Sequence, residues 1–376
     1  MRVMISAGGT GGGVFPALTV ARALRGEAPG VSLSFVGARG DMARELARRD
    51  GSLFDSYHEV LAGPLHGVPR LEQIANVFRT LIGIVQALIL VIRLRPQVLF
   101  LTGGWVGGPA AVACWLLRCP VVIYVPDIEP GLALRILGRT FARTIAATVE
   151  ETGAYFPGKQ VVVTGYPLRP EFRETDRVSA QRALGLDPDR QTLVVFGGSR
   201  GARSINTALT AIAPDLLASG VQIVHSTGQL DWPEMQAWHA RLPAAQQAEY
   251  RIFPFVAEMW DVLAAADLVI SRAGAATLAE YPALGVPAIL VPYPYAWRYQ
   301  KINADYLVGR DAAVLLEDDR LKDDLLPLIR ALLGDGARLE TMRAAASSLR
   351  PPDGARAIAR LLLRTAGHEV DDASGS

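Results

Sequence analysis

Residues 1–24 read MRVMISAGGTGGGVFPALTVARAL. The apolar run from Arg2 to Ser6 predicts a strand, residues 8–13 predict a glycine loop, and residues Pro16 to Leu24 predict an amphipathic helix. A glycine loop between a strand and a helix N-terminus presents backbone N–H groups to an anion. This stretch therefore predicts a parallel α/β fold with a ligand held close to the loop.

The glycine spacing of this loop argues against a dinucleotide site. A dinucleotide fingerprint needs glycines at offsets 0, 2 and 5. Counting from Gly8 places Thr10 at the second position, and counting from Gly9 places Val14 at the third. The second predicted strand carries Gly37 where a ribose-binding acid is needed. A tight turn without a ligand is the alternative, but a six-residue loop with one side-chain oxygen favours close ligand approach.

The same pattern recurs later in the chain. VVFGGSRG at 194–201 repeats ISAGGTGG at 5–12, and apolar runs alternate with helical stretches throughout. The repeat predicts two Rossmann-like domains whose parallel sheets face each other across a ligand cleft. The stretch GYPLRPEFRE, which contains two prolines and several charged residues, marks the predicted boundary between the domains. The predicted parts are an N-terminal domain, 1–168 with a C-terminal helix at 352–366, a C-terminal domain, 169–350, and a disordered tail, 367–376.

The charge is divided unevenly along the chain of 376 residues. Residues 1–169 carry a net charge of +6 and the remainder −5, for a total of +1. A basic first half predicts contact with anionic lipid or a phosphorylated substrate. Nucleic acid is not an expected partner, because dense Lys/Arg runs interleaved with aromatics are missing from the sequence. Cys114 and Cys119 lack metal or redox spacing and are expected to be buried thiols in a reducing compartment.

The most apolar stretch is TLIGIVQALILVIRLRP. From Leu81 to Ile92 it has twelve residues, interrupted by Gln86 and bounded by Arg79 and Arg93. A membrane-spanning helix needs about 20 residues, so we expect either a buried crossover helix or a helix with one face in a membrane surface. Phe78, Leu81 and Ile82 are spaced to share such a face. No signal peptide is expected.

Three stretches of the second half carry further candidate ligand groups. GGSRGA contains Ser199, SRAGAATLAE contains Glu280 one turn into a predicted helix, and VPYPYAWRYQ ends at Gln300. The helix is expected to begin near Ala275, with free N–H groups at residues 275–277. A carboxylate at position 280 can accept both hydroxyls of a ribose; the alternative is an ordinary first-turn acid that stabilises the helix.

These motifs together resemble a known family. GGTGG…P, GYPLR, GGSRGARSIN, FPFVAEM, RAGAATLAE and LVPYPY…Q follow the order and approximate spacing of MurG-type enzymes, from residue 1 to about residue 365. Those enzymes are GT-B transferases of glycosyltransferase family 28. They move N-acetylglucosamine from UDP to lipid I, a polyprenyl-diphosphate-linked sugar, in peptidoglycan synthesis. The resemblance implies the same fold, donor and lipid-linked acceptor, and a peripheral location at the cytoplasmic face of the plasma membrane.

The resemblance also implies roles for individual residues. In the first half, Thr10, Gly11 and Gly12 would meet the acceptor diphosphate, and the membrane patch would lie near Phe78, Leu81, Ile82 and Trp115. In the second half, the implied donor contacts are Arg169 and Ser199 with the diphosphate, Phe255 and Val256 with uracil, Arg272, Ala275, Ala276 and Thr277 over the nucleotide, Glu280 with the ribose diol, and Gln300 with the sugar.

This chain departs from the family pattern mainly in its first half. Gly13 replaces a histidine that is a candidate general base, and residues 124–127 read Tyr-Val-Pro-Asp where the family has His-Glu-Gln-Asn. Tyr299 replaces the first of two glutamines. We therefore expect Asp127 to be the substitute base and an acceptor-binding residue, with Glu129 as second choice. The alternative for Asp127 is a helix cap or turn residue.

The expected mechanism is a direct displacement with inversion, in which a base takes the proton of the acceptor hydroxyl. No metal and no cofactor are expected, since the one Asp-x-Asp sequence, Asp187 to Asp189, reads as a turn. Three other functions stay open: transfer to another glycolipid acceptor, a non-catalytic or weakened UDP-sugar-binding protein, and a nucleotide-sugar epimerase.

Overall fold

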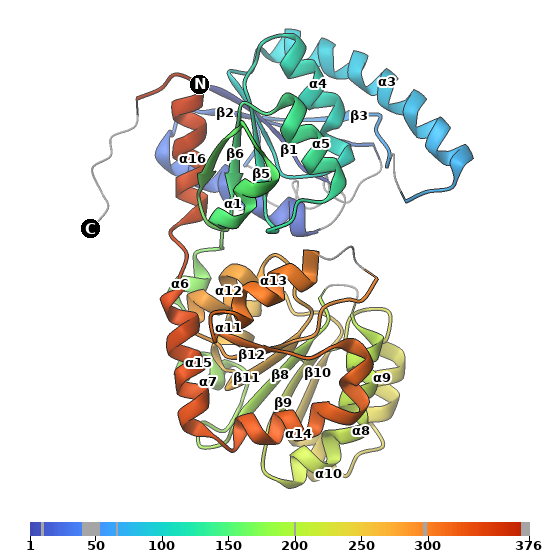
Figure 1. Ribbon diagram of the computed structural model, residues 1–376, viewed down its shortest axis with the longest axis vertical. Helices are drawn as coiled ribbons and strands as arrows, with labels where there is room; N and C mark the ends of the chain where they lie inside the picture. The colour runs from blue at the N-terminus through green and yellow to red at the C-terminus, as the bar shows by residue number, and fades with distance from the viewer. Residues whose placement is uncertain (9–10, 40–52, 65–66, 199–200, 296–298, 370–376) are drawn as a thin grey trace. The chain divides into compact units, whose positions relative to one another are not determined.

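The protein consists of two compact α/β units (Figure 1). A computed structural model describes residues 1–8, 11–39, 53–64, 67–198, 201–295 and 299–369. Unit 1 comprises Met1–Leu168 and Pro352–Ser376, and unit 2 comprises Arg169–Pro351. The chain therefore passes between the units twice, after Leu168 and after Pro351.

Unit 1 is built on a parallel sheet with strand order β3-β2-β1-β4-β5-β6-β7. Every neighbouring pair is parallel, and the strands at the centre are almost wholly buried, as expected of a sheet covered on both faces. Because the order reverses between β1 and β4, the loops after these two strands flank a topological switch point. The strands are β1 (Arg2–Ser6), β2 (Ser32–Ala38), β3 (Ser56–Val60), β4 (Val98–Leu101), β5 (Val121–Val125), β6 (Thr144–Ala147) and β7 (Gln160–Val163).

The connections of unit 1 are mostly helical, as parallel strands require. They are α1 (Gly11–Glu27), α3 (Arg70–Leu94), η1 (Trp105–Gly107), α4 (Gly108–Leu116), α5 (Leu132–Phe141), η2 (Glu150–Tyr155) and the returning α16 (Gly354–Thr365). Cys114 and Cys119 are free thiols in the core on the α4 side of the sheet, which confirms the predicted burial of both.

The C-terminal helix α16 packs against α1, although more than 300 residues separate them (Figure 1). Glu27, at the end of α1, accepts hydrogen bonds from Arg356 Nε at 2.6 Å and from Arg360 Nε at 2.9 Å. Burial alone would raise the pKa of the Glu27 carboxyl, but the two arginines outweigh it and lower the pKa below its usual value. The carboxylate thus joins the two ends of unit 1.

Unit 2 repeats the design of unit 1 with a parallel sheet of order β10-β9-β8-β11-β12-β13. Its switch point lies between β8 and β11, so β8 occupies the place that β1 has in unit 1. The strands are β8 (Thr192–Phe196), β9 (Gln222–Ser226), β10 (Tyr250–Phe253), β11 (Leu268–Ser271), β12 (Ala288–Leu290) and β13 (Ala313–Leu315).

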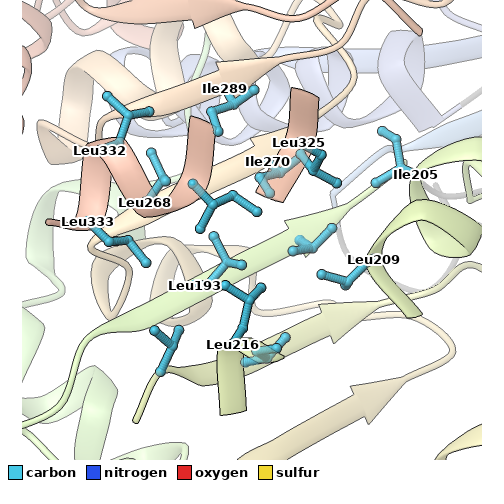
Figure 2. Packing of buried hydrophobic residues seen from close by; sticks show 14 of the residues in the cluster. Leu193, Ile205, Leu209, Leu216, Leu268, Ile270, Ile289, Leu325, Leu332 and Leu333 are labelled. Carbon is cyan, nitrogen blue, oxygen red and sulfur yellow. The ribbon is translucent and has the colours of Figure 1, made fainter. Parts of the chain in front are cut away.

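The helices of unit 2 bury a leucine- and isoleucine-rich core against this sheet. Figure 2 shows Leu325, Leu332 and Leu333 of one helix facing strand residues that include Leu193, Leu268 and Ile289. The helical segments are α6 (Glu171–Glu174), α7 (Arg177–Ala183), α8 (Arg203–Ala218), α9 (Trp232–His239), α10 (Ala244–Glu249), α11 (Met259–Ala264), α12 (Thr277–Leu284), α13 (Tyr299–Val308), η3 (Asp318–Arg320), α14 (Leu321–Leu333) and α15 (Gly336–Ser348).

The predicted fold class is confirmed, and the repeated glycine motif does mark equivalent central strands in both units. Two helix starts differ from the sequence prediction. α1 begins at Gly11, so three of the loop glycines form the first turn of the helix, and α12 begins at Thr277 rather than near Ala275. The Asp187–Asp189 segment is a turn, in which the Asp189 N–H donates to Asp187 Oδ1 at 3.0 Å.

The apolar helix α3 is longer than the sequence interpretation allowed. It has 25 residues, and an 18-residue window has a mean hydropathy of 2.0, so by length and composition it is able to cross a membrane. The prediction that this helix is too short to cross a membrane counted only twelve residues. It was wrong because the helix continues through Arg79 for more than two further turns. The structure instead places α3 on the surface of unit 1: Gly83, Ala87 and Val91 are buried against it, while Phe78, Leu81 and Ile82 are exposed.

We predict that Glu27→Gln destabilises the protein by about 1 kcal/mol at neutral pH, because two charge-assisted hydrogen bonds weaken at a partly exposed site. A carboxyl whose pKa is lowered by folding stabilises most above its unfolded value, and that contribution is lost as the pH falls through the folded value. Urea unfolding of both proteins should therefore give a difference at pH 7 that shrinks below about pH 4.5.

Glu340→Gln is the matched control, since Glu340 is 76% exposed and pairs only at 3.7 Å with Arg343. A Glu27→Gln protein that unfolds like wild type at pH 7 would contradict the stabilising role.

Candidate functional site

The loops at the switch point of unit 1 pack backbone against backbone. A Cβ atom built on Gly103, just after β4, would lie 2.7 Å from the nitrogen of Gly8, just after β1. Thr102 Oγ1 donates to the carbonyl of Gly13 at 2.6 Å and so ties the β4 loop to the first turn of α1. The glycines are therefore required for this close approach, independently of any ligand.

Gly13, where the family pattern has histidine, belongs to this packing. A Cβ atom at Gly13 would lie 3.3 Å from the carbonyl oxygens of both Gly8 and Thr102. These atoms are backbone and cannot rotate away, so a larger side chain would require the loops to separate by a few tenths of an ångström. Glycine at position 13 thus fits the close packing of these loops. Gly11 and Gly12 begin α1, and Thr10 lies outside the described residues.

The loop after β5 differs from the family pattern in a second way. Tyr124, which stands in the place of the family histidine, is completely buried, and its hydroxyl lies 2.8 Å from Thr148 Oγ1. Thr148 in turn donates to the Pro126 carbonyl at 2.8 Å. Burial raises the pKa of the Tyr124 hydroxyl well above its usual value, so this side chain is a neutral structural group that supports the loop.

Two carboxylates follow Tyr124 on this loop. Asp127 is partly buried, and its backbone carbonyl accepts a hydrogen bond from Thr152 Oγ1 at 3.5 Å. Glu129 is also partly buried, and its Oε2 atom is enclosed without a hydrogen-bond partner in the described part of the chain. An enclosed carboxylate oxygen without a partner is a natural acceptor for a ligand hydroxyl. Both acids therefore stay candidates for the base.

At the switch point of unit 2, the loop after β8 has the same dependence on glycine. Gly198 and Gly201 have φ values of +87° and +81°, and a Cβ atom at Gly201 would lie 2.3 Å from the Thr227 carbonyl oxygen. The N-cap position of α8, Ala202, has no side-chain cap. Its first N–H groups are thus available to an anion at the carboxyl end of β8. Ser199 lies outside the described residues.

A buried polar network supports this loop from below. Asn206 donates through Nδ2 to the Thr227 carbonyl and to Asp231 Oδ2, both at 2.9 Å. Its Oδ1 atom must then accept from His225 Nε2, also at 2.9 Å, so His225 Nδ1 accepts from the Tyr250 hydroxyl at 2.8 Å. Burial lowers the pKa of His225 to about 3, which keeps this tautomer neutral. The network connects α8 to β9 and β10 directly beneath the glycine loop.

The turn before α12 provides fewer free donors than the sequence predicted. The backbone N–H of Thr277 donates to the Gly274 carbonyl at 3.0 Å, and Thr277 Oγ1 donates to the same carbonyl at 2.7 Å. The prediction of a free N–H at Thr277 was wrong because this N–H donates a hydrogen bond within a tight turn. The backbone N–H groups of Ala275 and Ala276 make no such hydrogen bond to any described residue, so these two stay candidates for ligand binding.

Glu280 is the most strongly perturbed acid of unit 2. Burial raises the pKa of its carboxyl to about 7, and the nearby Arg169 guanidinium opposes the increase. The side chain of no described residue donates a hydrogen bond to this carboxylate. A desolvated carboxylate with unused acceptor capacity on the first turn of a helix is a good acceptor for paired ligand hydroxyls.

Arg169 links Glu280 to the loop that follows β10. Its Nη1 donates to the carbonyl of Ala257 at 3.1 Å, and its guanidinium stacks 4.3 Å above the ring of Trp260. Phe255 in the same loop is 47% exposed, which suits a residue that stacks on a planar ligand. The structure thus brings together Arg169, Glu280 and the Phe255–Ala257 segment, and their roles toward a ligand stay predictions. Val256 is partly buried beside them.

Arg272 and Gln300 have protein partners of their own. The Arg272 guanidinium donates to Asp318 Oδ1 at 2.5 Å, to Ser204 Oγ at 2.8 Å and to two carbonyls after β12. It therefore ties α8, β11 and η3 together, and a direct ligand contact stays a prediction. Gln300 Oε1 accepts from the Tyr293 N–H at 2.8 Å, which closes the loop between β12 and α13 and leaves its amide N–H groups for a ligand.

Two supporting groups were missed by the sequence interpretation. Trp260 was not distinguished from core aromatics, because its stacking on Arg169 depends on tertiary structure. Asn206 does lie within the quoted motif GGSRGARSIN, three residues into α8. A polar residue on the buried side of a helix next to a glycine loop was the available signal for it.

Models of known protein families match both halves of the chain. The model of the glycosyltransferase family 28 N-terminal domain matches residues 3–146, and that of the family 28 C-terminal domain matches residues 192–358. The chain belongs to glycosyltransferase family 28. The predicted membership is thereby confirmed, and the two family models correspond to the cores of units 1 and 2.

Full-length relatives extend this result. The chain is 38% identical over 373 residues to a protein from Desulforudis audaxviator (strain MP104C), with 98% of this chain and 99% of the relative covered. That relative is named UDP-N-acetylglucosamine–N-acetylmuramyl-(pentapeptide) pyrophosphoryl-undecaprenol N-acetylglucosamine transferase. Among solved structures, Acinetobacter baumannii MurG is similar with a TM-score of 0.75 and 28% identity, over 96% of this chain and 99% of that one.

The fold itself is shared more widely. A putative UDP-N-acetylglucosamine 2-epimerase from Listeria monocytogenes has a TM-score of 0.71 over 100% of this chain and 98% of that one, at 14% identity. Similarity at this level of identity concerns the fold alone. The family 28 assignment therefore rests on sequence, and it makes this chain a glycosyltransferase.

Proposed function

We propose that this chain transfers N-acetylglucosamine from UDP-N-acetylglucosamine to the lipid-linked N-acetylmuramyl-pentapeptide, the step from lipid I to lipid II. The observation that carries the proposal is the 38% identity to a transferase of that name along 98% of the chain. The perturbed acid Glu280 and the uncapped start of α8, both in unit 2, supply the chemistry that a UDP-sugar needs.

In the proposed donor site, each group of the nucleotide meets a matching group of unit 2. The Glu280 carboxylate accepts both ribose hydroxyls, and Phe255 with Val256 contacts the uracil. The diphosphate is held by Arg169, by Ser199 and by the first N–H groups of α8. The N–H groups of Ala275 and Ala276 close over the nucleotide, and Gln300 reaches the sugar.

The proposed reaction is an inverting displacement. An acceptor hydroxyl oxygen bonds to the anomeric carbon of N-acetylglucosamine while the bond from that carbon to the diphosphate oxygen breaks. The hydroxyl proton passes to a carboxylate, and the electron pair of the broken bond leaves with UDP. Positive charge from Arg169 and the α8 N-terminus stabilises the leaving diphosphate, so the proposed mechanism needs no metal.

The acceptor half of the proposal needs its own test, because Gly13 and Tyr124 both depart from the family pattern in unit 1. Thr10, Gly11 and Gly12 are proposed to meet the acceptor diphosphate. A screen with radiolabelled UDP-N-acetylglucosamine tests the proposal: transfer to lipid I supports it, and transfer only to another glycolipid replaces the acceptor. UDP binding without turnover identifies a sensor, and consumption of the donor without acceptor identifies an epimerase.

We predict that Glu280→Gln weakens UDP binding in calorimetry by about 10- to 100-fold, because two charge-assisted hydrogen bonds to the ribose are lost. The same change should raise the stability of the ligand-free protein at pH 8. Folding raises the Glu280 pKa from 4.5 to about 7, so ionisation costs stability as the pH rises through this window, and glutamine avoids that cost.

Weaker UDP binding together with higher stability of the ligand-free protein distinguishes a ligand-binding carboxylate from a structural one. If Glu280→Gln leaves UDP affinity unchanged in a folded protein, Glu280 does not belong to the donor site.

We predict that Asp127→Asn lowers turnover by about 10²- to 10⁴-fold, the usual contribution of a positioned base, with little change in UDP affinity. Glu129→Gln is the matched comparison, because Glu129 lies on the same loop and has an enclosed oxygen without a described partner. Loss of turnover in Glu129→Gln alone would move the base to Glu129. If neither change affects turnover, the base is elsewhere in the protein.

The membrane contact is proposed to lie on α3 and the end of α4. The outward face of α3 carries exposed apolar side chains, and Trp115, on α4, is exposed beside them. Exposed arginines accompany this apolar surface: Arg70, Arg79, Arg93, Arg95 and Arg118. An apolar stripe with basic flanks is typical of helices that lie in an anionic membrane surface. The proposed location is therefore peripheral, at the cytoplasmic face of the plasma membrane.

We predict that the protein floats with anionic liposomes at low salt and that Phe78→Ser/Leu81→Ser reduces the bound fraction at least about fivefold. Val178→Ser/Leu230→Ser is the control, since both residues are exposed apolar side chains of unit 2. Equal binding by the two double variants would exclude α3 as the contact, and no binding by wild type would exclude the membrane partner.

A further inference from the structure

Three side chains form a closed cluster at the carboxyl ends of the central strands of unit 2. Arg272 follows β11 directly, Ser204 lies in the first turn of α8, and Asp318 begins η3. The Arg272 guanidinium donates through Nη1 to Asp318 Oδ1 at 2.5 Å and through Nη2 to Ser204 Oγ at 2.8 Å. Ser204 Oγ in turn donates to Asp318 Oδ1 at 2.8 Å. The three groups thus make a ring of hydrogen bonds, the Arg272 cluster.

The ion pair of the Arg272 cluster is largely shielded from solvent. The side chains of Arg272 and Asp318 are 10% and 20% exposed. Two charged neighbours in the sequence have other partners: Glu317 pairs with Lys301 at 3.1 Å, and Arg203 pairs with Asp231 at 2.9 Å. A carboxylate in such a place is destabilising unless a cation lies beside it. Arg272 is therefore the group that neutralises Asp318.

Arg272 also holds the segment that leads to Gln300. Its Nη1 donates to the carbonyls of Val291 and Pro292 at 3.2 and 3.3 Å, and its guanidinium lies 5.3 Å from the centre of the Tyr293 ring. The Tyr293 N–H donates to Gln300 Oε1 at 2.8 Å. The Arg272 cluster thus connects the first turn of α8, which is proposed to bind the diphosphate, with Gln300, which is proposed to reach the sugar.

We propose that Asp318 and Ser204 are positioning residues of the donor site, and that Arg272 acts through them rather than by direct contact with the diphosphate. This inference rests on the proposed function. The cluster fixes two segments that would meet one donor molecule, so neither has to be ordered when the donor binds. Arg272 also neutralises a carboxylate beside the first turn of α8, where an unpaired negative charge would repel an anionic ligand.

The two possible roles of Arg272 lead to different results when Asp318 is also changed. If Arg272 contacts the diphosphate directly, removing the Asp318 carboxylate from an Arg272→Gln protein does not restore UDP binding. If Arg272 acts by neutralising Asp318, removing the carboxylate restores part of the binding. The combination of the two substitutions therefore distinguishes an indirect role from a direct contact.

The test is calorimetric titration of the full chain with UDP at low ionic strength. We expect Arg272→Gln to weaken UDP binding at least about tenfold, because Asp318 is left without its cation beside the anion site. We expect Arg272→Gln/Asp318→Asn to bind UDP at least about threefold more tightly than Arg272→Gln alone.

Two milder variants test the positioning role in steady-state kinetics. Ser204→Ala removes one hydrogen bond without changing the charge, and Asp318→Asn removes the charge but keeps the size of the side chain. Each is expected to raise the KM for UDP-N-acetylglucosamine about two- to fivefold and to leave the KM for the lipid-linked acceptor unchanged. These variants decide the question if Arg272→Gln does not fold, and an unchanged donor KM in both would overturn the inference.

Arg177→Gln is the matched control, because Arg177 pairs at 2.7 Å with Asp267, which immediately precedes β11 at its opposite, amino end. This variant should lower the urea midpoint of unfolding but keep UDP affinity within about twofold of wild type. A loss of UDP affinity in Arg177→Gln as large as in Arg272→Gln would indicate a general effect of stability and overturn the inference.

Failure of the inference and failure of the proposed function give different results. Equal UDP affinities for Arg272→Gln and Arg272→Gln/Asp318→Asn, with normal binding and transfer by wild type, overturn the inference alone. A wild-type protein that does not bind UDP overturns the proposed function and the inference with it. Partial rescue by Asp318→Asn, together with an unaffected control, supports the inference.

Discussion

Close contact between backbone segments at the two switch points is the constraint on which the rest of this structure depends. A Cβ atom at Gly103 would come within 2.7 Å of Gly8, and one at Gly201 would come within 2.3 Å of Thr227. Only glycine permits these approaches, and they hold the N-termini of α1 and α8 against the carboxyl ends of the central strands. Helix N–H groups are thereby directed to the place where a parallel sheet binds ligands.

The second organising feature is a difference between polar groups of unit 2: some are buried with hydrogen-bond partners, and one, Glu280, has no donor among the described side chains. His225 and Asn206 are buried with their hydrogen bonds satisfied, and they support the glycine loop after β8. Glu280 is desolvated without a hydrogen-bond donor among the described side chains, and its pKa rises accordingly. A satisfied polar group is an element of structure, whereas an unsatisfied one stores free energy that a ligand can release.

Unit 1 has the same strand, glycine loop and helix arrangement as unit 2. Two side chains of its loops, at positions 13 and 124, differ from the family pattern. Gly13 fits between the loops after β1 and β4, where a Cβ atom would lie 3.3 Å from the carbonyl oxygens of Gly8 and Thr102. Tyr124 fills the core and supports the loop that carries Asp127 and Glu129. The same unit leaves the outward face of α3 apolar and exposed, although an ordinary globular surface would be polar there.

The sequence alone determined the fold class, the repeated strand–loop–helix motif and the family, because these follow from local periodicity and from glycines that no other residue can replace. It also indicated Arg169, Phe255 and Glu280 as candidate site residues, since each lies in a specific motif. Tertiary structure alone decided the length and exposure of α3, the use of the Thr277 N–H within its own turn, and the protein partners of Arg272. These depend on which groups meet after distant segments pack, and burial, hydrogen-bond satisfaction and the resulting pKa values are properties of that packing rather than of local sequence.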